Sequence, residues 1–212
     1  EGGGLEDQRQ DRRGPPGFRG LILAGGISGG HRMVGEALRE VFERYEIPAT
    51  HFNALDMTWR PVTSAYRTVY RAILTHAPWI WGWIYRTTRD RHRAIPLWKT
   101  RLHALYNRLQ GRVLERHLEA TQPALVLCTH YYPCEVASRM RREGRLRSRI
   151  VFVLTDHEPH PFHLVSEVDL FTVPTERARA ALLERGVPER RVAAAGIPVR
   201  AAFGTARRDA AR

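Results

Sequence analysis

The stretch Leu21-Ile-Leu-Ala-Gly-Gly-Ile-Ser-Gly-Gly-His31 decides the fold of this 212-residue chain. Four apolar residues lead into a loop rich in glycine. The apolar residues that follow recur at helical spacing: Met33, Ala37, Leu38, Val41 and Phe42. A short apolar run bounded by glycine is typical of a buried strand, and the later spacing is typical of an amphipathic helix. The stretch therefore predicts a strand, a glycine loop and a helix in succession.

The rest of the chain continues this alternation. Apolar runs predict strands at 49–55, 124–128, 150–154 and 168–173, and helical patterns lie at about 101–120, 135–142 and 176–185. Strands that alternate with helices form a parallel sheet with helices on both faces, because each crossover lays a helix on the sheet. We therefore expect an α/β fold, a Rossmann-like parallel sheet with a helical insertion that is aromatic and basic.

Three loops follow predicted strands, at 25–31, 129–133 and 155–163. In parallel sheets ligands bind beyond the carboxyl ends of the strands, so we expect these loops to meet at one edge. The glycines of the first loop let the backbone approach a polar ligand closely, and the helix start after it favours negative charge. A tight turn without a ligand explains the same glycines.

The composition, 43% hydrophobic and 26% charged, is that of a globular protein. The longest apolar stretch, 77–85, is far shorter than the roughly 20 residues that cross a bilayer. Two cysteines, Cys128 and Cys134, exclude a disulfide framework and a four-cysteine zinc site. A buried, reduced pair in a reducing cytoplasm is the simplest interpretation.

Charge points to an anionic partner. The 34 Lys and Arg residues outnumber the 22 Asp and Glu residues, which gives a net charge of +12, and segment 60–116 carries twelve basic residues and two acidic ones. Such a surface attracts an anionic membrane or a nucleic acid, unless it is simply a soluble, arginine-rich face. No helix-turn-helix, zinc-finger or RNA-recognition pattern accompanies the charge, so we expect a membrane surface and no nucleic acid.

The insertion at about 60–101 concentrates aromatic residues in Pro78-Trp-Ile-Trp-Gly-Trp-Ile-Tyr85. Trp and Tyr favour the bilayer interface, where an amphipathic segment with a basic face can lie. The candidate membrane or acceptor contacts are Trp79, Trp81, Trp83, Tyr85 and Arg86. The alternative is a helical hairpin whose aromatic residues fill the core of the domain.

The two ends lack apolar periodicity. Residues 1–20 are rich in glycine and in charges of both signs, which predicts a disordered leader. Residues 204–212 are Ala/Arg-rich and polar, which is typical of the start of a linker. Residues 21–203 are then one domain.

Several landmarks in a fixed order carry a family resemblance: Gly29-Gly-His31, the Trp/Tyr-rich insertion, Cys128-Thr-His-Tyr-Tyr-Pro133, Val153-Leu-Thr-Asp156 with His160 beyond it, and Gly196-Ile-Pro-Val-Arg200 leading to Phe203. Over roughly 21–203 the chain resembles the N-terminal half of the monogalactosyldiacylglycerol synthase and processive diacylglycerol glucosyltransferase family, glycosyltransferases of the two-domain B architecture. Two positions depart from the family pattern. Ser28 replaces a glycine, and His163 replaces a large aromatic residue, often Trp.

The resemblance implies a Rossmann-like, acceptor-binding domain of a glycolipid-forming hexosyltransferase. The enzyme would act peripherally on the cytoplasmic face of the cell membrane, moving a hexose from a nucleotide sugar, UDP-hexose, to diacylglycerol or a related lipid. It also implies a C-terminal donor domain that is absent here, so we expect this chain alone to be inactive. The alternative is a non-catalytic protein of the same descent that binds lipid or the membrane surface.

Transfer to a hydroxyl needs a base, and the resemblance assigns this role to His31 and Asp156 without fixing which takes the proton. An unperturbed imidazole is mostly neutral at pH 7 and accepts a proton. A helix cap or surface position for His31, and a loop cap for Asp156, are the alternatives. The candidate substrate-binding residues are Gly25, Gly26, Ser28, Gly29, Gly30, His130 and His160.

The pattern Asp156-His157-x-x-His160-x-x-His163, with His130 nearby, also suggests a metal site. The resemblance implies metal-independent transfer, and Pro159 and Pro161 disfavour a regular helix that would align these histidines. We therefore expect no metal and no cofactor, with the nucleotide sugar as co-substrate.

Overall fold

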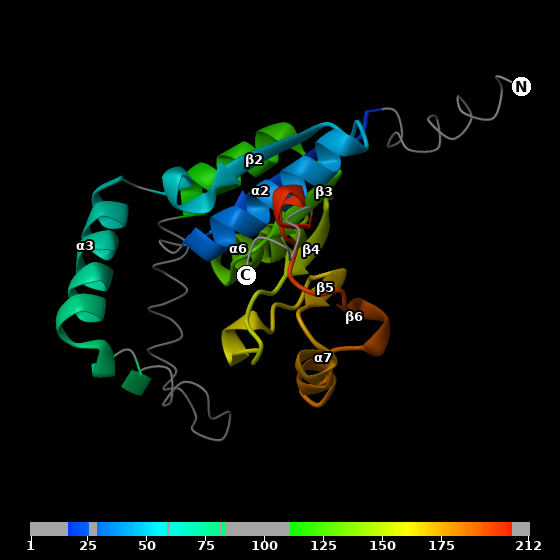
Figure 1. The fold of residues 1–212 in the computed structure, drawn as a ribbon. Coiled ribbons are helices and arrows are strands. Elements are labelled where there is room, and N and C mark those ends of the chain that lie inside the picture. The colour runs from blue at the N-terminus through cyan, green and yellow to red at the C-terminus, as the bar shows by residue number, and fades with distance from the viewer. Residues whose placement is uncertain (1–16, 26–28, 59, 81, 84–110, 205–212) are drawn as a thin grey trace, which may run out of the picture.

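The computed structural model describes residues 17–25, 29–58, 60–80, 82–83 and 111–204. At its centre is a six-stranded sheet in the order β2-β1-β3-β4-β5-β6, and all neighbouring strands are parallel (Figure 1). The strands are β1 (Gly20–Ala24), β2 (Ala49–Asn53), β3 (Leu125–Cys128), β4 (Arg149–Val153), β5 (Leu170–Val173) and β6 (Val192–Ala194).

The central strands are buried on both faces. Every residue of β1 is buried, and the last three residues of β3 are buried as well. A strand covered on both sides has no polar face, so it reads as a continuous apolar run rather than as an alternation. Ile22, Leu23, Ile150 and Phe152 are among the largest of the side chains that fill the resulting core.

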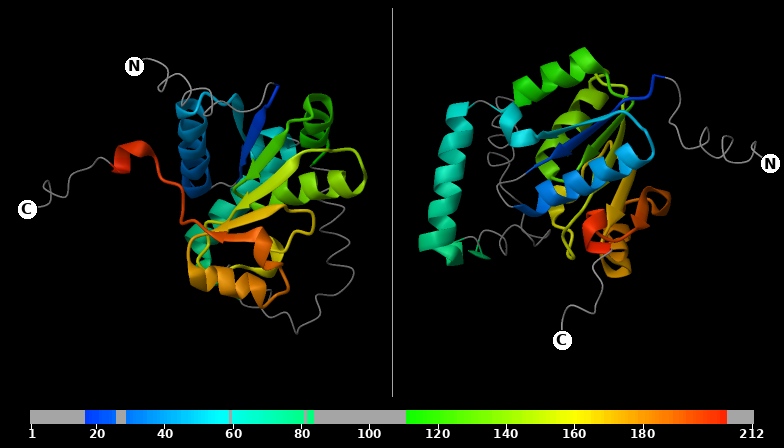
Figure 2. Two further views of the ribbon diagram at one scale, coloured as in Figure 1. Left: turned by 90° about the vertical axis from the view of Figure 1, so that its right-hand side faces the viewer. Right: turned by 45° about the horizontal axis from the view of Figure 1, so that its top comes forward.

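Helices cover both faces of the sheet. Helix α2 (Gly29–Arg44) connects β1 to β2, whereas the helix at 111–121 and α6 (Tyr131–Arg142) lead across the sheet in the opposite direction. Right-handed crossovers that run in opposite directions place their helices on opposite faces. Figure 2 shows α2 on one side of the sheet and the helix at 111–121 on the other. The predicted Rossmann-like α/β fold is confirmed.

Some element boundaries differ from the prediction. Helix α6 begins four residues before 135, because Nδ1 of His130 accepts the backbone N–H of Tyr132 and so caps the helix. Strand β2 ends early because the side-chain oxygen of Asn53 accepts the N–H of Leu55, which starts the 3-10 turn η1 (Ala54–Met57). Strand β6 was not predicted, since three residues are too few to form a recognisable apolar run.

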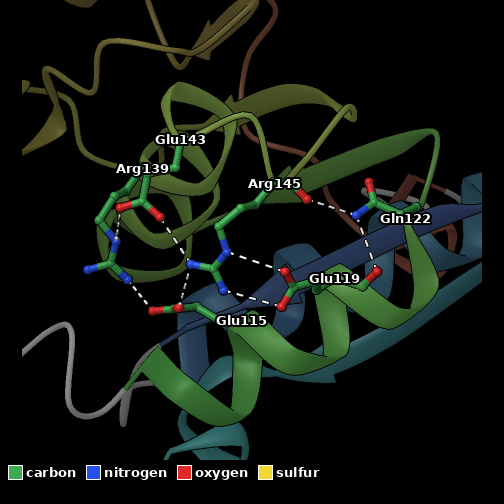
Figure 3. Close-up of polar contacts among 6 residues, drawn as sticks. All are labelled: Glu115, Glu119, Gln122, Arg139, Glu143 and Arg145. Atoms are coloured by element: carbon green, nitrogen blue, oxygen red, sulfur yellow. Dashed lines mark hydrogen bonds and ion pairs between the residues drawn. The ribbon is translucent and has the colours of Figure 1, made fainter.

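A network of ion pairs fastens the helix at 111–121 to α6 and to the turn after it (Figure 3). Arg139 and Arg145 both contact the nearly buried carboxylate of Glu115. Nη1 of Arg145 also lies 3.0 Å from Glu143, and its Nη2 lies 3.3 Å from Glu119. Hydrogen bonds to these three carboxylates raise the pKa of Arg145. The network therefore fixes the helix that follows the insertion.

The described part of the insertion stands away from the sheet. It contains helix α3 (Arg60–His76), which lies beside the sheet in Figure 1, and two tryptophans beyond it. Trp79 is 70% exposed and Trp83 is 58% exposed. The helical-hairpin alternative required aromatic residues of the insertion to fill the core, and these two side chains do not.

Several predictions fall outside the described residues. These concern most of the leader, the linker start beyond 204, the insertion from 84 onward, and five site candidates: Gly26, Ser28, Trp81, Tyr85 and Arg86. Among the helices that are described, none has the length and apolar composition needed to cross a membrane.

Candidate functional site

The loops after β1 and β3 meet at the carboxyl edge of the sheet. The two strands are neighbours, yet the helices that follow them lie on opposite faces, so a crevice opens between the two connections. His31 stands in the first turn of α2, and His130 caps α6 across the crevice. Their ring centroids are 5.1 Å apart, with the ring planes at 86°.

Gly25 is the residue that permits this approach. A Cβ on Gly25 would lie 2.9 Å from Cγ of His130 and closer still to its Cβ. By contrast, Gly29 and Gly30 are exposed, and a Cβ on either would meet nothing within 4 Å. The three glycines therefore differ, because the first is enclosed by protein and the other two face open space.

His130 is held as a neutral ring. Its Nδ1 accepts the N–H of Tyr132 at 3.3 Å, and its ring also packs on that of Tyr131. Removal from solvent lowers the pKa of His130 to about 3, with further lowering from His31 and His163. This imidazole is therefore uncharged at neutral pH, and its lone pair is used in the helix cap.

His31 is suited to accept a proton. Its Nδ1 is buried and has no hydrogen-bond partner within the described residues. Burial lowers the pKa of His31, while the Asp156 carboxylate and the Thr129 backbone oppose the shift. The imidazole is consequently neutral at pH 7, and a carboxylate stands near enough to stabilise the charge that it gains on protonation.

Asp156 reaches the site from the loop after β4. Its side chain is 56% exposed, and Oδ2 lies 3.4 Å from Nε2 of His163. The loops after β1, β3 and β4 thus bring His31, His130 and Asp156 together, in agreement with the expected convergence. The catalytic roles of His31 and Asp156 remain predictions.

The partner of Asp156 was missed in the sequence analysis. His163 appeared there only as a departure from the family pattern and as part of a metal hypothesis. Its position seven residues after Asp156, at the end of a turn started by Pro161, is the signal that was available. Removal from solvent lowers the pKa of His163 to about 4, although the Asp156 carboxylate raises it.

His160 is placed as a cap. It is 5% exposed, and its Nδ1 accepts the N–H of Phe162 at 3.3 Å at the start of the 3-10 turn η2 (Pro161–His163). Its ring lies 4.6 Å from that of Phe162. The predicted role of His160 in substrate binding stays a prediction.

An apolar pocket of about 390 Å³ is lined by Gly30 and Thr155, the residues that precede His31 and Asp156 in the chain. Its walls come from the start of α2, the loop after β4 and the segment after β6: Gly30, Met33, Val34, Thr155, Ile197, Pro198, Val199, Arg200 and Phe203. Arg200 ties that last segment to α2 through an ion pair with Glu40 at 2.6 Å. Within the described ranges, no group of three His, Cys, Asp or Glu residues is arranged to hold a metal ion.

Comparisons with known proteins relate the sequence of this chain to one family. The family model for monogalactosyldiacylglycerol (MGDG) synthase matches residues 31–199. The chain is 23% identical over 177 residues to the uncharacterized glycosyltransferase YkoN of Bacillus subtilis (strain 168), across 84% of this chain and 46% of that protein. It is 24% identical over 185 residues to the processive diacylglycerol beta-glucosyltransferase of Bacillus thuringiensis (strain Al Hakam), across 86% of this chain and 45% of that protein.

The fold has a counterpart among solved structures. The apo form of the lipopolysaccharide outer core galactosyltransferase WaaB superposes with a TM-score of 0.51 at 13% identity, over 84% of this chain and 45% of that chain. This likeness concerns the fold alone. The chain spans less than half the length of the relatives that it matches.

Proposed function

Because the chain belongs to the monogalactosyldiacylglycerol synthase family, we propose that it is the acceptor-binding half of a membrane-surface glycosyltransferase. The enzyme moves a hexose from a nucleotide sugar to diacylglycerol or a related lipid. The observation that carries this proposal is that the Asp156 carboxylate acts on a neutral His31, while Gly30 and Thr155, the residues just before them, line an apolar pocket. A base next to an apolar surface is what a lipid hydroxyl requires.

His31 is the base in this proposal. The acceptor oxygen forms a bond to the anomeric carbon of the hexose, and the bond from that carbon to the diphosphate breaks, with its electron pair leaving on the diphosphate. The hydroxyl proton passes to the imidazole of His31. The Asp156 carboxylate then stabilises the imidazolium, because it already raises the pKa of His31 against the effect of burial.

The apolar pocket supports a lipid acceptor. Gly30 and Thr155, which precede His31 and Asp156 in the chain, both line it, so a hydroxyl at its mouth would lie near the base. The remaining walls are largely hydrocarbon, from residues such as Met33 and Val34. Exposed Gly29 and Gly30 leave open space above the start of α2 for a polar headgroup or the donor diphosphate.

Contact with an anionic membrane belongs to the same proposal. From Arg60 to Trp83 the chain has no acidic residue in its sequence, and Val69, Trp79 and Trp83 are exposed. Aromatic side chains at a headgroup interface and arginines near anionic lipid both stabilise peripheral binding. We place the protein on the cytoplasmic face of the cell membrane, with no nucleic-acid partner.

The donor site lies outside this chain in our proposal. The relatives are more than twice as long as the part matched here, which leaves room for a domain that binds UDP-hexose. The acceptor half needs no metal or cofactor for the proton transfer described above. We expect the isolated chain to bind lipid and to transfer no sugar.

The test is a transfer assay with the protein that contains this chain, purified from its source cells. Labelled UDP-glucose or UDP-galactose is supplied with vesicles that contain diacylglycerol. His31→Ala and Asp156→Ala should each abolish transfer, whereas Arg32→Ala, on the exposed side of the same helix, should retain it. Persistent transfer in both site variants would overturn the assignment. Vesicle binding without any transfer would instead support the non-catalytic, lipid-binding alternative.

Membrane contact is tested separately by flotation with anionic and neutral vesicles. Trp79→Ser and Trp83→Ser should weaken binding to the anionic vesicles. Val113→Ser is the matched control, since Val113 is an exposed apolar residue, 49% accessible, on the helix at 111–121. Equal binding by all three variants would remove the insertion from the membrane contact.

A further inference from the structure

The imidazole of His163 has a defined direction. Its Nδ1 accepts the backbone N–H of His160 at 3.0 Å. A neutral imidazole has one donor nitrogen and one acceptor nitrogen, so the proton of His163 must be on Nε2. Nε2 is the atom that lies 3.4 Å from Oδ2 of Asp156. The backbone therefore fixes the tautomer that donates toward the carboxylate.

The ring of His163 is also rigid. It is 9% exposed, and it meets the ring of Phe152 edge-on at 5.8 Å and 89°. Phe152 is itself a buried residue of β4. The ring of His160 lies against that of His163 as well, with the ring centroids 6.3 Å apart. A side chain held on three sides is a fixed point against which a mobile group can be oriented.

Asp156 is much less enclosed than His163. Its side chain is 56% exposed, and it forms an ion-pair contact with His163. Its charge nevertheless acts on His31 across the crevice. We propose that His163 is a positioning residue, whose Nε2–H holds the Asp156 carboxylate in the orientation that faces His31. This inference rests on the proposed function, in which that pair performs the proton transfer.

A neutral histidine suits this role. The groups that act on His163 are Asp156, His160, His31 and Arg185, and removal from solvent dominates, so its pKa falls to about 4. At neutral pH the ring donates a hydrogen without bringing a positive charge that would cancel the charge of Asp156. At 3.4 Å the pair is an ion-pair contact and not yet a hydrogen bond, and such contacts often tighten only when a substrate binds.

Two substitutions separate the donor from the cap. In His163→Asn the amide oxygen takes the place of Nδ1 and keeps the acceptor for the His160 N–H, but the side chain is too short to reach Asp156. In His163→Gln the amide nitrogen takes the place of Nε2 and keeps the donor. Asp156→Asn gives the reference for complete loss of the carboxylate charge.

The first readout is the histidine titration of this chain by long-range proton–nitrogen NMR. We expect the Nε2–H tautomer for His163 in the unaltered chain. Asp156→Asn should lower the pKa of His31, His163→Asn should lower it by at least half as much, and His163→Gln should leave it near the original value. An Nδ1–H tautomer, an unchanged His31 in His163→Asn, or a larger shift in His163→Gln than in His163→Asn would each overturn the proposal.

The second readout is transfer by the whole protein. His163→Asn should lower kcat roughly tenfold or more with the KM for the nucleotide sugar unchanged, and His163→Gln should restore most of the loss. If no lipid accepts sugar, the proposed function fails, while the NMR result still decides whether His163 orients Asp156. An unchanged kcat in His163→Asn, in an enzyme that does transfer sugar, overturns the positioning role.

Discussion

Replacing Gly25 by alanine tests the crevice directly. The new methyl group would lie 2.9 Å from Cγ of His130 and nearer to its Cβ, where ordinary contacts begin at about 3.4 Å. Cβ of His130 cannot rotate away, because it is attached to the backbone that caps α6. Relief requires either a shift of strand β1 or displacement of the His130 ring from its cap and from His31.

The expected cost follows from these two routes. Overpacking a close-fitted site costs about 1–3 kcal/mol, and loss of a helix cap costs about 1 kcal/mol more. Gly25→Ala should therefore lower the free energy of unfolding by about 2–4 kcal/mol. Urea denaturation measures this difference, and thermal unfolding should shift by roughly 2–4 °C for each kcal/mol.

Gly30→Ala, at the start of α2, is the matched control. Its methyl group meets nothing within 4 Å, and Gly30 is already helical, so alanine should be neutral or stabilising by up to about 1 kcal/mol. If Gly25→Ala unfolds at the urea concentration of the original chain, the enclosure of Gly25 by His130 is wrong. Equal destabilisation of both variants would refute the distinction between an enclosed and an open glycine.

Burial would raise the pKa of Asp169, but hydrogen bonds from the Arg141 side chain and a backbone N–H lower it from an ordinary 3.8 to about 2. The ionised Asp169 carboxylate therefore contributes its full stabilisation above about pH 4, and this contribution is lost as the pH falls toward 2. Urea denaturation between pH 2 and 5 should show this loss, and Asp169→Asn should remove that part of the pH dependence. Glu115→Gln removes a nearly buried carboxylate that pairs with two arginines, and it should lower the free energy of unfolding by about 1–3 kcal/mol in the same assay. Glu176→Gln is the control: its side chain is 77% exposed, and the free energy of unfolding should change by less than about 0.5 kcal/mol. Cys128 and Cys134 are buried, and burial together with the neighbouring thiol raises the pKa of Cys134. The folded chain should therefore resist Ellman's reagent, and two equivalents of thiol should react after denaturation. Rapid labelling of the folded chain would contradict this.

The fold could be predicted because its central strands are buried on both faces. Such strands appear as apolar runs that need no partner to be recognised, as in Leu21 to Ala24 and Ile150 to Val153. Boundaries set by side-chain caps were harder to predict. The start of α6 depends on a ring nitrogen of His130, and the end of β2 depends on the Asn53 side chain. Neither contact leaves a periodic signal.

The site was predicted only in part. Strand ends identified His31, His130 and Asp156 as neighbours, since parallel strands end at one edge. The contact between Asp156 and His163 depends on the course of a short turn around Pro161, and no spacing rule describes such a turn. The pocket escaped notice because its walls come from three segments that are distant in sequence.

The attachment of Arg200 to α2 has a mechanical consequence. Arg200 forms ion pairs with Glu36 and Glu40, and the N–H of Ala201 donates a hydrogen bond to Glu40 at 3.0 Å. His31 lies on the same helix, nine residues before Glu40, and is therefore about 14 Å from it at 1.5 Å per residue. An α-helix of this length transmits a push or a tilt as a stiff rod. A pull on the chain near Arg200 would therefore move the imidazole relative to Asp156, which lies in the loop after β4 and not on α2.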